Sequence, residues 1–251
     1  MDSVAYLPLS LAGALRRDLD VTANNIANAD TAGFKRERVS FETYVQRSAA
    51  ADRDEDVNFV VDRGSFLDTA QGALQHTGAP LDLALEGSGW FAYEGADGAR
   101  SYGRDGRLSL DGQGNLVTLT GARVLDAGGA PIGLPPGDLG AVSVARDGTI
   151  TGPDGAVVGQ VGVFEIPDLQ AYERQGAGMF AAPADADVAP VLPAGDTAIV
   201  QGAIEGSNVQ PVLEMTRLMD IQRSFERAMK LTTTHDDLRR DSISRLGRAA
   251  P

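Results

Sequence analysis

The chain begins with a hydrophobic pattern of helical period. Between residues 11 and 29 the apolar positions recur every three or four residues and fall on one face at 100° per residue, namely Leu11, Ala12, Leu15, Leu19, Thr22, Ile26 and Ala29. This spacing predicts an amphipathic helix. Gly33 then offers the positive φ that ends helices and shapes turns. Apolar and polar residues alternate from residue 39 to residue 45, which predicts an extended arm.

The helical period returns after "GSNVQP" and continues until Asp236 interrupts it. One face of this predicted second helix carries Leu218, Ile221, Phe225, Ala228, Met229 and Thr232. A thinner stripe on another side carries Leu213, Leu231 and Leu238. Two apolar stripes on one helix indicate two packing neighbours. We therefore expect both terminal helices to be ordered mainly by packing against other subunits.

Between the two helical patterns the sequence is typical of short strands separated by turns. Five Asp-Gly pairs are bracketed by short apolar runs: Asp97-Gly98, Asp105-Gly106, Asp111-Gly112, Asp147-Gly148 and Asp154-Gly155. Asp-Gly between apolar runs is a strong hairpin signal, so the middle is predicted to be an antiparallel β-domain. The predicted division is 1–46 for the first helix and arm, 47–58 for a linker, 59–206 for the β-domain, and 207–251 for the last helix.

Composition separates the same regions. The net charge is −13, and residues 48–207 hold eight basic against 23 acidic side chains together with 27 of the 30 glycines. An acidic middle without a basic stripe argues against a nucleic-acid partner. The absence of cysteine excludes disulfides, thiolate nucleophiles and cysteine metal sites.

No apolar run is long enough to cross a membrane, so no membrane insertion is expected. The stretch "VAYLPLSLAGAL" has the length of a signal-peptide core, but Asp2 precedes it, Pro8 interrupts it, and cleavage would remove part of the helical stripe. We therefore expect no cleaved signal peptide.

Candidate chemistry is sparse. His76 and His235 lack the spacing of a metal site, and "GSGWFA" and "GAGMFA" match a dinucleotide motif only loosely and without a helix after them. Trp90, Phe91 and Tyr93 could line a sugar-binding surface, but alternation into a sheet core is the favoured interpretation. We predict no catalytic, metal or cofactor site; the alternative is a secreted β-rich enzyme acting on carbohydrate with a carboxylate pair and Trp90.

The stretch "VTANNIANADTAGFKRERVSF" carries Asn24, Asn25 and Asn28 just before the predicted turn. Asparagine is a mediocre helix former because its amide competes for backbone hydrogen bonds. Three in five positions therefore indicate another role. Either the amides bond across to neighbouring backbones and set the register between subunits, or they fray the helix end before Gly33.

The segment "ANNIANADTAGFKRERVSF" resembles the N-terminal signature of the bacterial flagellar rod and hook family, A-N-N-[IL]-A-N-x-x-T-x-G-F-[KR]. Residues 74–135 are similar to the opening of that family's middle domain, and "QGAIEGSNVQPVLEMTRLMDIQRSFERAMKLTTTHDD" resembles its C-terminal segment. Two departures are modest. The family's Y-T-R is here Tyr102-Gly103-Arg104, and its S-N-V-[ND] ends in Gln210.

The resemblance implies a structural rod subunit that transmits torque in the flagellar basal body, with an antiparallel β-domain inserted between terminal helices that pair as a coiled coil. It also implies assembly with copies of itself and other rod proteins, and export unfolded through the flagellar type III apparatus into the periplasmic rod. Within the family the resemblance implies a position in the proximal rod, and a distal rod or hook-type position is the alternative. Helix packing is expected from Leu15, Leu19, Ile26, Leu218, Ile221, Phe225 and Met229. The turn and a subunit contact are expected from Asn24, Asn25, Asn28, Gly33 and Phe34.

Overall fold

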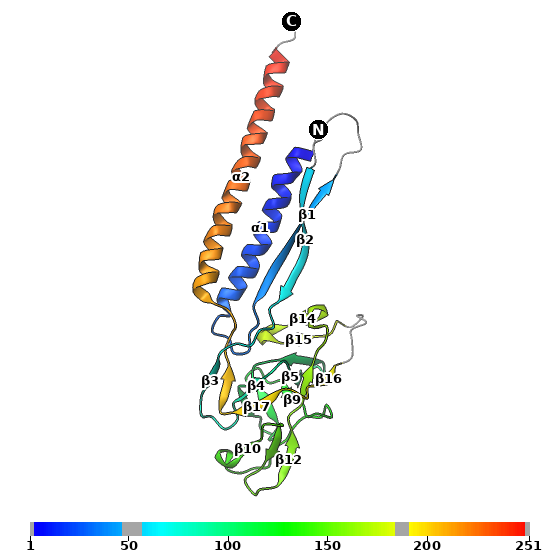
Figure 1. Ribbon diagram of the computed structural model, residues 1–251, viewed down its shortest axis with the longest axis vertical. Coiled ribbons are helices and arrows are strands. Elements are labelled where there is room, and N and C mark those ends of the chain that lie inside the picture. The colour runs from blue at the N-terminus through cyan, green and yellow to red at the C-terminus, as the bar shows by residue number, and fades with distance from the viewer. Residues whose placement is uncertain (1–2, 47–56, 184–190, 249–251) are drawn as a thin grey trace. The chain divides into compact units, whose positions relative to one another are not determined.

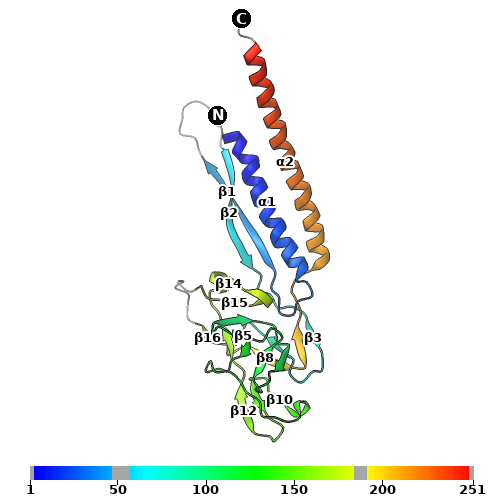
Figure 2. The same ribbon diagram turned by 180° about the vertical axis from the view of Figure 1, so that it is seen from behind.

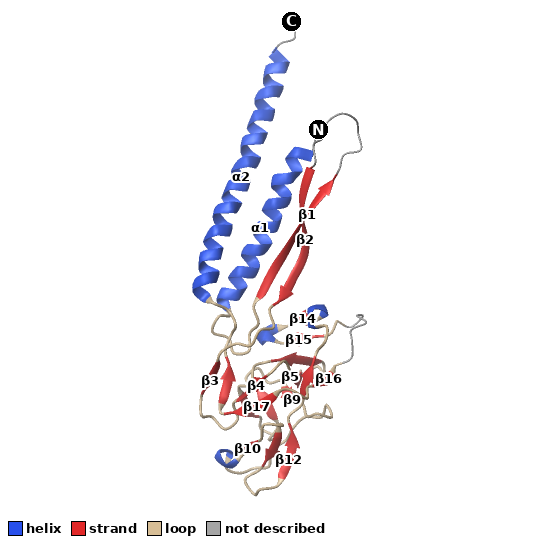
Figure 3. Ribbon diagram, in the orientation of Figure 1, coloured by secondary structure: helices blue, strands red, loops and turns tan. Residues whose placement is uncertain are grey.

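The computed structural model describes residues 3–46, 57–183 and 191–248. The chain divides into two compact units. We call residues 1–27, 37–66 and 210–251 the helical unit, and residues 28–36 and 67–209 the β unit. Figure 3 shows both long helices in the helical unit and a series of short strands in the β unit. The fold is therefore mainly β with one helix near each end of the chain.

The helical unit contains two helices and a pair of strands. Its elements are α1 (Ser3–Ala27), β1 (Glu37–Gln46), β2 (Val57–Leu67) and α2 (Pro211–Arg248). α1 packs against both α2 and β1. Figures 1 and 2, from opposite sides, place α1 between α2 and the two strands, with α2 running antiparallel to α1 and continuing past its first residues.

Both helices differ in length from the sequence-based prediction. α1 begins at Ser3 rather than Leu11, and α2 runs to Arg248 instead of stopping near Asp236. Asp236 was expected to end the apolar stripe, but no proline or glycine follows Pro211 until Gly247. A solvent-exposed helix needs no apolar stripe, and Asp241 and Arg245 form an i,i+4 ion pair at 2.8 Å. The helix therefore continues for 38 residues.

Strand β2 is the second difference. The prediction placed the β-domain boundary at residue 59, whereas β2 begins at Val57 and forms a two-stranded sheet with β1. Residues 57–66 therefore belong to the helical unit. Most of the predicted linker, residues 47–56, lies outside the described residues.

The β unit holds the remaining strands and three single 3₁₀ turns. The strands are β3 (Leu74–His76), β4 (Leu83–Glu86), β5 (Trp90–Glu94), β6 (Arg100–Gly103), β7 (Leu108–Leu110), β8 (Leu116–Thr118), β9 (Arg123–Val124), β10 (Ser143–Val144), β11 (Thr149–Thr151), β12 (Val157–Gln160), β13 (Val163–Glu165), β14 (Glu173–Arg174), β15 (Phe180–Ala181), β16 (Leu192–Pro193), β17 (Ala198–Gln201) and β18 (Ala203–Glu205). The 3₁₀ turns are Leu139–Ala141, Leu169–Ala171 and Gly176–Gly178.

Among the described residues, the largest sheet of the β unit has nine strands. Its main path is β14-β15-β6-β5-β9-β8-β7, with β13 joining β5 to β16. The strands β10, β11 and β12 form a second sheet, and β17 and β18 return late in the chain to pair with β4 and β3. These pairs are antiparallel, as predicted.

The core of the β unit lies on both faces of β5. Phe91 and Tyr93 belong to one buried cluster, and Trp90 and Ala92 belong to another. All four are at most 3% exposed. The prediction that these aromatic residues alternate within a sheet core is confirmed, and a sugar-binding surface around Trp90 is excluded because its ring is buried.

Four of the five Asp-Gly pairs lie at turns between paired strands. They connect β5 to β6, β7 to β8, β10 to β11 and β11 to β12. Asp105-Gly106 differs, because it leads from β6 to β7 and these strands do not pair. Gly106 instead lets the chain pass against Leu83, whose carbonyl oxygen lies 1.7 Å from where a Cβ would be.

Candidate functional site: a buried charge cluster in the β unit and an exposed helix face

The segment after α1 enters the β unit through a tight turn. Gly33 has φ +68°, as predicted, and its amide donates to the Glu205 carbonyl at 2.8 Å. A Cβ at this position would lie 2.4 Å from the carbonyl carbon of Arg104. Only glycine allows both the positive φ and this close approach of two backbones.

Phe34 follows the turn and is 2% exposed. The Arg174 guanidinium lies over its ring at 4.5 Å and donates a hydrogen bond to the Lys35 carbonyl at 2.7 Å. Gly33 and Phe34 were expected to contribute a subunit contact. Both residues are buried within their own chain, where they shape the turn, and the subunit contact stays a prediction.

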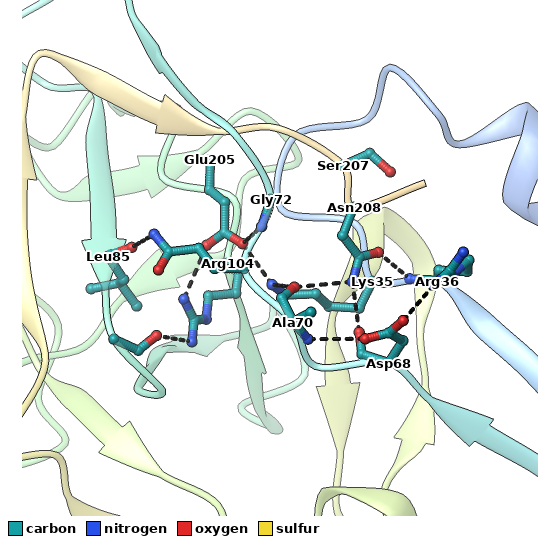
Figure 4. Close-up of polar contacts among 12 residues, drawn as sticks. Lys35, Arg36, Asp68, Ala70, Gly72, Leu85, Arg104, Glu205, Ser207 and Asn208 are labelled. Atoms are coloured by element: carbon teal, nitrogen blue, oxygen red, sulfur yellow. Dashed lines mark hydrogen bonds and ion pairs between the residues drawn. The ribbon is translucent and has the colours of Figure 1, made fainter. Parts of the chain in front are cut away.

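Three charged side chains meet in the interior of the β unit (Figure 4). The Glu205 carboxylate accepts from Lys35 Nζ at 2.6 Å through Oε1 and from Arg104 Nη1 at 3.0 Å through Oε2. The Gly72 amide adds a third bond to Oε1 at 2.8 Å. The side chains of Lys35 and Glu205 are fully buried, and that of Arg104 is 2% exposed. We call Lys35, Arg104 and Glu205 the charge cluster.

The charge cluster contains two cations and one anion. Burial lowers the pKa of Lys35 below its usual value, and the neighbouring Glu205 carboxylate opposes this effect. Burial lowers the pKa of Arg104 in the same way, again opposed by Glu205. Arg104 also donates to the Gly87 carbonyl at 2.7 Å and lies 5.1 Å from the centroid of the Trp90 ring. Glu205 is therefore the anion that makes burial of both cations tolerable.

Further polar contacts lie next to the charge cluster. Arg36 and Asp68 form an ion pair at 2.6 Å. The Asn208 side chain accepts from the Arg36 amide and donates to the carbonyls of Asp68 and Ala70 (Figure 4). The segment that follows α1, the segment that follows β2 and the segment that precedes α2 are thus bonded to one another inside the β unit.

In the helical unit the three asparagines have different surroundings. Asn25 is 2% exposed, and its amide donates to the Glu37 carbonyl at 2.8 Å and accepts from the Glu37 amide at 3.0 Å. Asn24 is exposed and Asn28 is half-buried. Asn25 thus bonds to a neighbouring backbone, that of the first residue of β1 in its own chain, whereas a role of the three amides in the register between subunits stays a prediction.

The residues predicted for helix packing are not equally buried. Ile221 is buried, and Leu15, Leu19, Ile26, Leu218 and Phe225 are half-buried, whereas Met229 is 42% exposed. The second apolar stripe of α2 stays open to solvent, with Leu213 at 59%, Leu231 at 63% and Leu238 at 63% exposed. Packing within this chain therefore covers only part of the apolar surface of the two helices.

Within the described residues, no group of three or more His, Asp or Glu side chains is arranged to hold a metal ion. No described helix is both long enough and apolar enough to cross a membrane. His76 lies exposed on β3.

Comparison with known proteins agrees with this architecture. Residues 12–35 match the model of the flagella basal body rod protein family, residues 84–152 that of the flagellar hook protein FlgE/F/G D1 domain, and residues 200–246 that of the flagellar basal body rod FlgEFG protein C-terminal. The chain is 40% identical to a flagellar basal-body rod protein FlgF of Caulobacter vibrioides, over 99% of each chain. The chain belongs to the flagellar basal-body rod protein family.

Within this family the chain resembles the FlgF members. An FlgF of Mesorhizobium japonicum is 38% identical over 98% of this chain and 99% of its own, whereas an FlgG of Bacillus subtilis is 30% identical over 90% and 92%. In the sequence, the short middle, the beginning "LRRDLDVTANNIAN" and the ending "RSFERAMKL" look most like FlgF, with FlgG as the close competitor, and these identities support FlgF. The chain is a structural rod protein and not an enzyme.

Each matched segment supplies one member of the charge cluster: Lys35 lies in the first, Arg104 in the second and Glu205 in the third. Sequence reasoning missed this cluster. Lys35 and Arg104 precede Glu205 by 170 and 101 positions along the chain. Nothing in the local sequence around the three residues indicates that they are buried. The one available signal was that all three lie inside segments that resemble the family.

Proposed function

We propose that this chain assembles with copies of itself and with other rod proteins into the axial shaft of the flagellum. In this proposal α1 and α2 pair as a coiled coil in the inner layer of the rod, and the β unit, inserted between them in sequence, lies outside. The shaft transmits torque through many packed interfaces, without bond chemistry. Because the chain resembles FlgF, we place it in the proximal part of the rod, in the periplasm.

The observation that carries this proposal is the apolar surface of α2. Among the described side chains of this helix, the large apolar ones that stay exposed are Val212, Leu213, Met215, Met219, Met229, Leu231, Leu238 and Ile243. Leu213, Leu231 and Leu238 line up along the helix, because 18 and seven residues are close to whole numbers of turns. Exposed apolar side chains that recur on one side of a helix indicate a protein interaction surface.

The proposal also includes export of the chain through the flagellar type III apparatus. An unfolded chain passing through the flagellar type III apparatus needs no cleaved signal peptide. It also gains nothing from disulfides, and the sequence contains no cysteine. The export apparatus is therefore proposed as a transient partner.

The experiment compares two variants of α2 that gain the same charge. Leu231→Asp places a carboxylate in the exposed apolar stripe, and Thr233→Asp places one on an exposed position two residues later, which is about 200° away and so on nearly the opposite side of the helix. Because both side chains are exposed in the single chain, both variants should fold as the unchanged protein does by circular dichroism. In cells that depend on this chain for motility, Leu231→Asp should abolish swimming and rod assembly, whereas Thr233→Asp should retain both.

Equal motility of the two variants would contradict the proposed use of the Leu213, Leu231 and Leu238 stripe. Detection of the Leu231→Asp protein outside the cytoplasm separates a defect in assembly from a defect in export.

A further inference from the structure

The covalent chain passes between the two units at four points, between residues 27 and 28, 36 and 37, 66 and 67, and 209 and 210. Within the β unit, the three stretches that reach these points are residues 28–36, 67–73 and 203–209. Each stretch could in principle open independently of the other two. Their hydrogen bonds show instead that they are joined side by side.

Asn208 lies in the third stretch and bonds to the other two stretches through its side-chain amide group. Its Oδ1 accepts from the Arg36 amide at 2.7 Å, and its Nδ2 donates to the Asp68 carbonyl at 2.7 Å and the Ala70 carbonyl at 3.0 Å. An asparagine side chain offers two donors and one acceptor oxygen with two lone pairs, so most of its bonding capacity is used here.

Lys35 and Glu205 make a second set of connections. Lys35 Nζ donates to the Ala70 carbonyl at 2.8 Å as well as to Glu205, and Glu205 Oε1 also accepts from the Gly72 amide. Backbone bonds add to this set, since the Asp68 amide donates to the Arg36 carbonyl and the Gly206 amide donates to the Ala73 carbonyl, each at 2.8 Å.

Glycine allows the stretches to approach this closely. A Cβ on Gly72 would lie 2.0 Å from the Gly206 carbonyl oxygen. The backbones of the second and third stretches are therefore in direct contact, with no side chain between them.

We propose that Lys35, Arg36, Asp68, Glu205 and Asn208 form a clasp that makes the three stretches one mechanical element. Because the bonds share partners, they open together rather than one at a time. A load that enters the β unit through one stretch is then shared by all three. The mechanical consequence rests on the proposed role in the rod, whereas the joint opening is a property of the single chain.

The test is amide hydrogen exchange of the purified full chain, resolved by NMR. Asn208→Ala removes the side chain that joins the stretches. Asn115→Ala is the matched control, because Asn115 is also half-buried in the β unit but its amide bonds to Asp111 within the β7–β8 turn. The amides followed are those of Gly33, Asp68 and Gly206, whose own acceptors remain in both variants.

We expect Asn208→Ala to accelerate exchange at Gly33, Asp68 and Gly206 together, by about five- to tenfold for the loss of a hydrogen-bonded connection. Amides of β5 and β6 should keep their rates, and Asn115→Ala should leave the three amides unchanged. Acceleration confined to Arg36, which loses its acceptor directly, would overturn the proposal.

A milder variant covers the case in which Asn208→Ala unfolds the whole β unit. Asp68→Asn keeps the shape of the side chain and its bond from the Ala70 amide but removes the charge that pairs with Arg36. The same three amides should accelerate together, and unchanged rates would overturn the clasp. Since exchange is measured on the single chain, its outcome is independent of whether the chain builds a rod.

Discussion

At the scale of single residues, the most consequential feature is the burial of three charges with a net charge of +1. An unpaired charge inside a protein is costly, whereas a paired and hydrogen-bonded one is tolerated. Glu205 accepts three hydrogen bonds and neutralises one of two cations, so its charge is the one on which the cluster depends. The cluster specifies which three chain segments must meet.

Glu205→Gln should therefore destabilise the β unit strongly. The variant leaves Lys35 and Arg104 buried without a counter-ion, which costs about 3–5 kcal/mol in the free energy of unfolding. The matched control is Glu86→Gln, because Glu86 pairs with Arg146 at 3.1 Å in an exposed ion pair. We expect the control to cost about 0–1 kcal/mol. Urea denaturation followed by Trp90 fluorescence measures both, and a similar cost for the two variants would contradict the role given to the cluster.

At the scale of elements, the buried face of α1 is not its most apolar face. Ala14, Asp18, Thr22 and Asn25 are buried, spaced by about one turn, while Leu11 is exposed and Leu15 and Leu19 are half-buried. Asp18 bonds to Arg217 of α2 at 2.9 Å. Burial raises the pKa of the Asp18 carboxyl and Arg217 opposes the rise. Polar pairs thus hold α1 to its own chain and leave apolar side chains partly open.

Asn25→Ala should weaken the attachment of β1 to α1. Removing the Asn25 amide breaks two hydrogen bonds to the backbone of the half-buried Glu37, which costs about 1–3 kcal/mol in the free energy of unfolding. Asn24→Ala is the control, because Asn24 is the exposed neighbour and alanine raises helix propensity equally at both sites. We expect the control to cost less than Asn25→Ala in the free energy of unfolding, because water solvates polar groups that are left without a partner at an exposed position.

Thermal unfolding followed by circular dichroism at 222 nm reports on the helical unit in both variants. Equal stability of Asn25→Ala and Asn24→Ala would mean that the bonds to Glu37 contribute nothing. The motility of the two variants then shows whether Asn24 serves a subunit contact, which stays a prediction.

At the scale of the whole molecule, the β unit is discontinuous in sequence. Residues 28–36 precede β1 and β2 but contribute Gly33, Phe34 and Lys35 to the interior of the β unit. A fragment of residues 28–209 contains all of this unit, whereas a fragment of residues 67–209 looks complete by its strands but lacks Lys35 and Phe34. The two fragments therefore differ in the charge cluster and in the partner of Arg174.

We expect the 28–209 fragment to unfold cooperatively and the 67–209 fragment to melt at least about 10 °C lower. The shorter fragment loses several kcal/mol with the Lys35 partner of Glu205, and each kcal/mol shifts the midpoint by about 2–4 °C in a unit of this size. Differential scanning calorimetry measures both midpoints. Equal midpoints would show that residues 28–36 are not part of the folded β unit.

The sequence by itself determined the features that depend on near neighbours in the chain. Hydrophobic period placed a helix near each end, and four of five Asp-Gly pairs marked real turns, because helix period and turn chemistry are set within a few residues. The motif around residues 24–35 also indicated the family. The positive φ of Gly33 followed from residue type alone.

Only the tertiary structure decided which polar groups are buried and which strands meet. Lys35 and Glu205 pair across 170 positions, and Asn25 bonds to β1 instead of facing outward. In the same way, β2 joins β1 in the helical unit rather than the β unit. Burial depends on the partner that covers a side chain, and that partner comes from a distant part of the sequence, so no local pattern could reveal it.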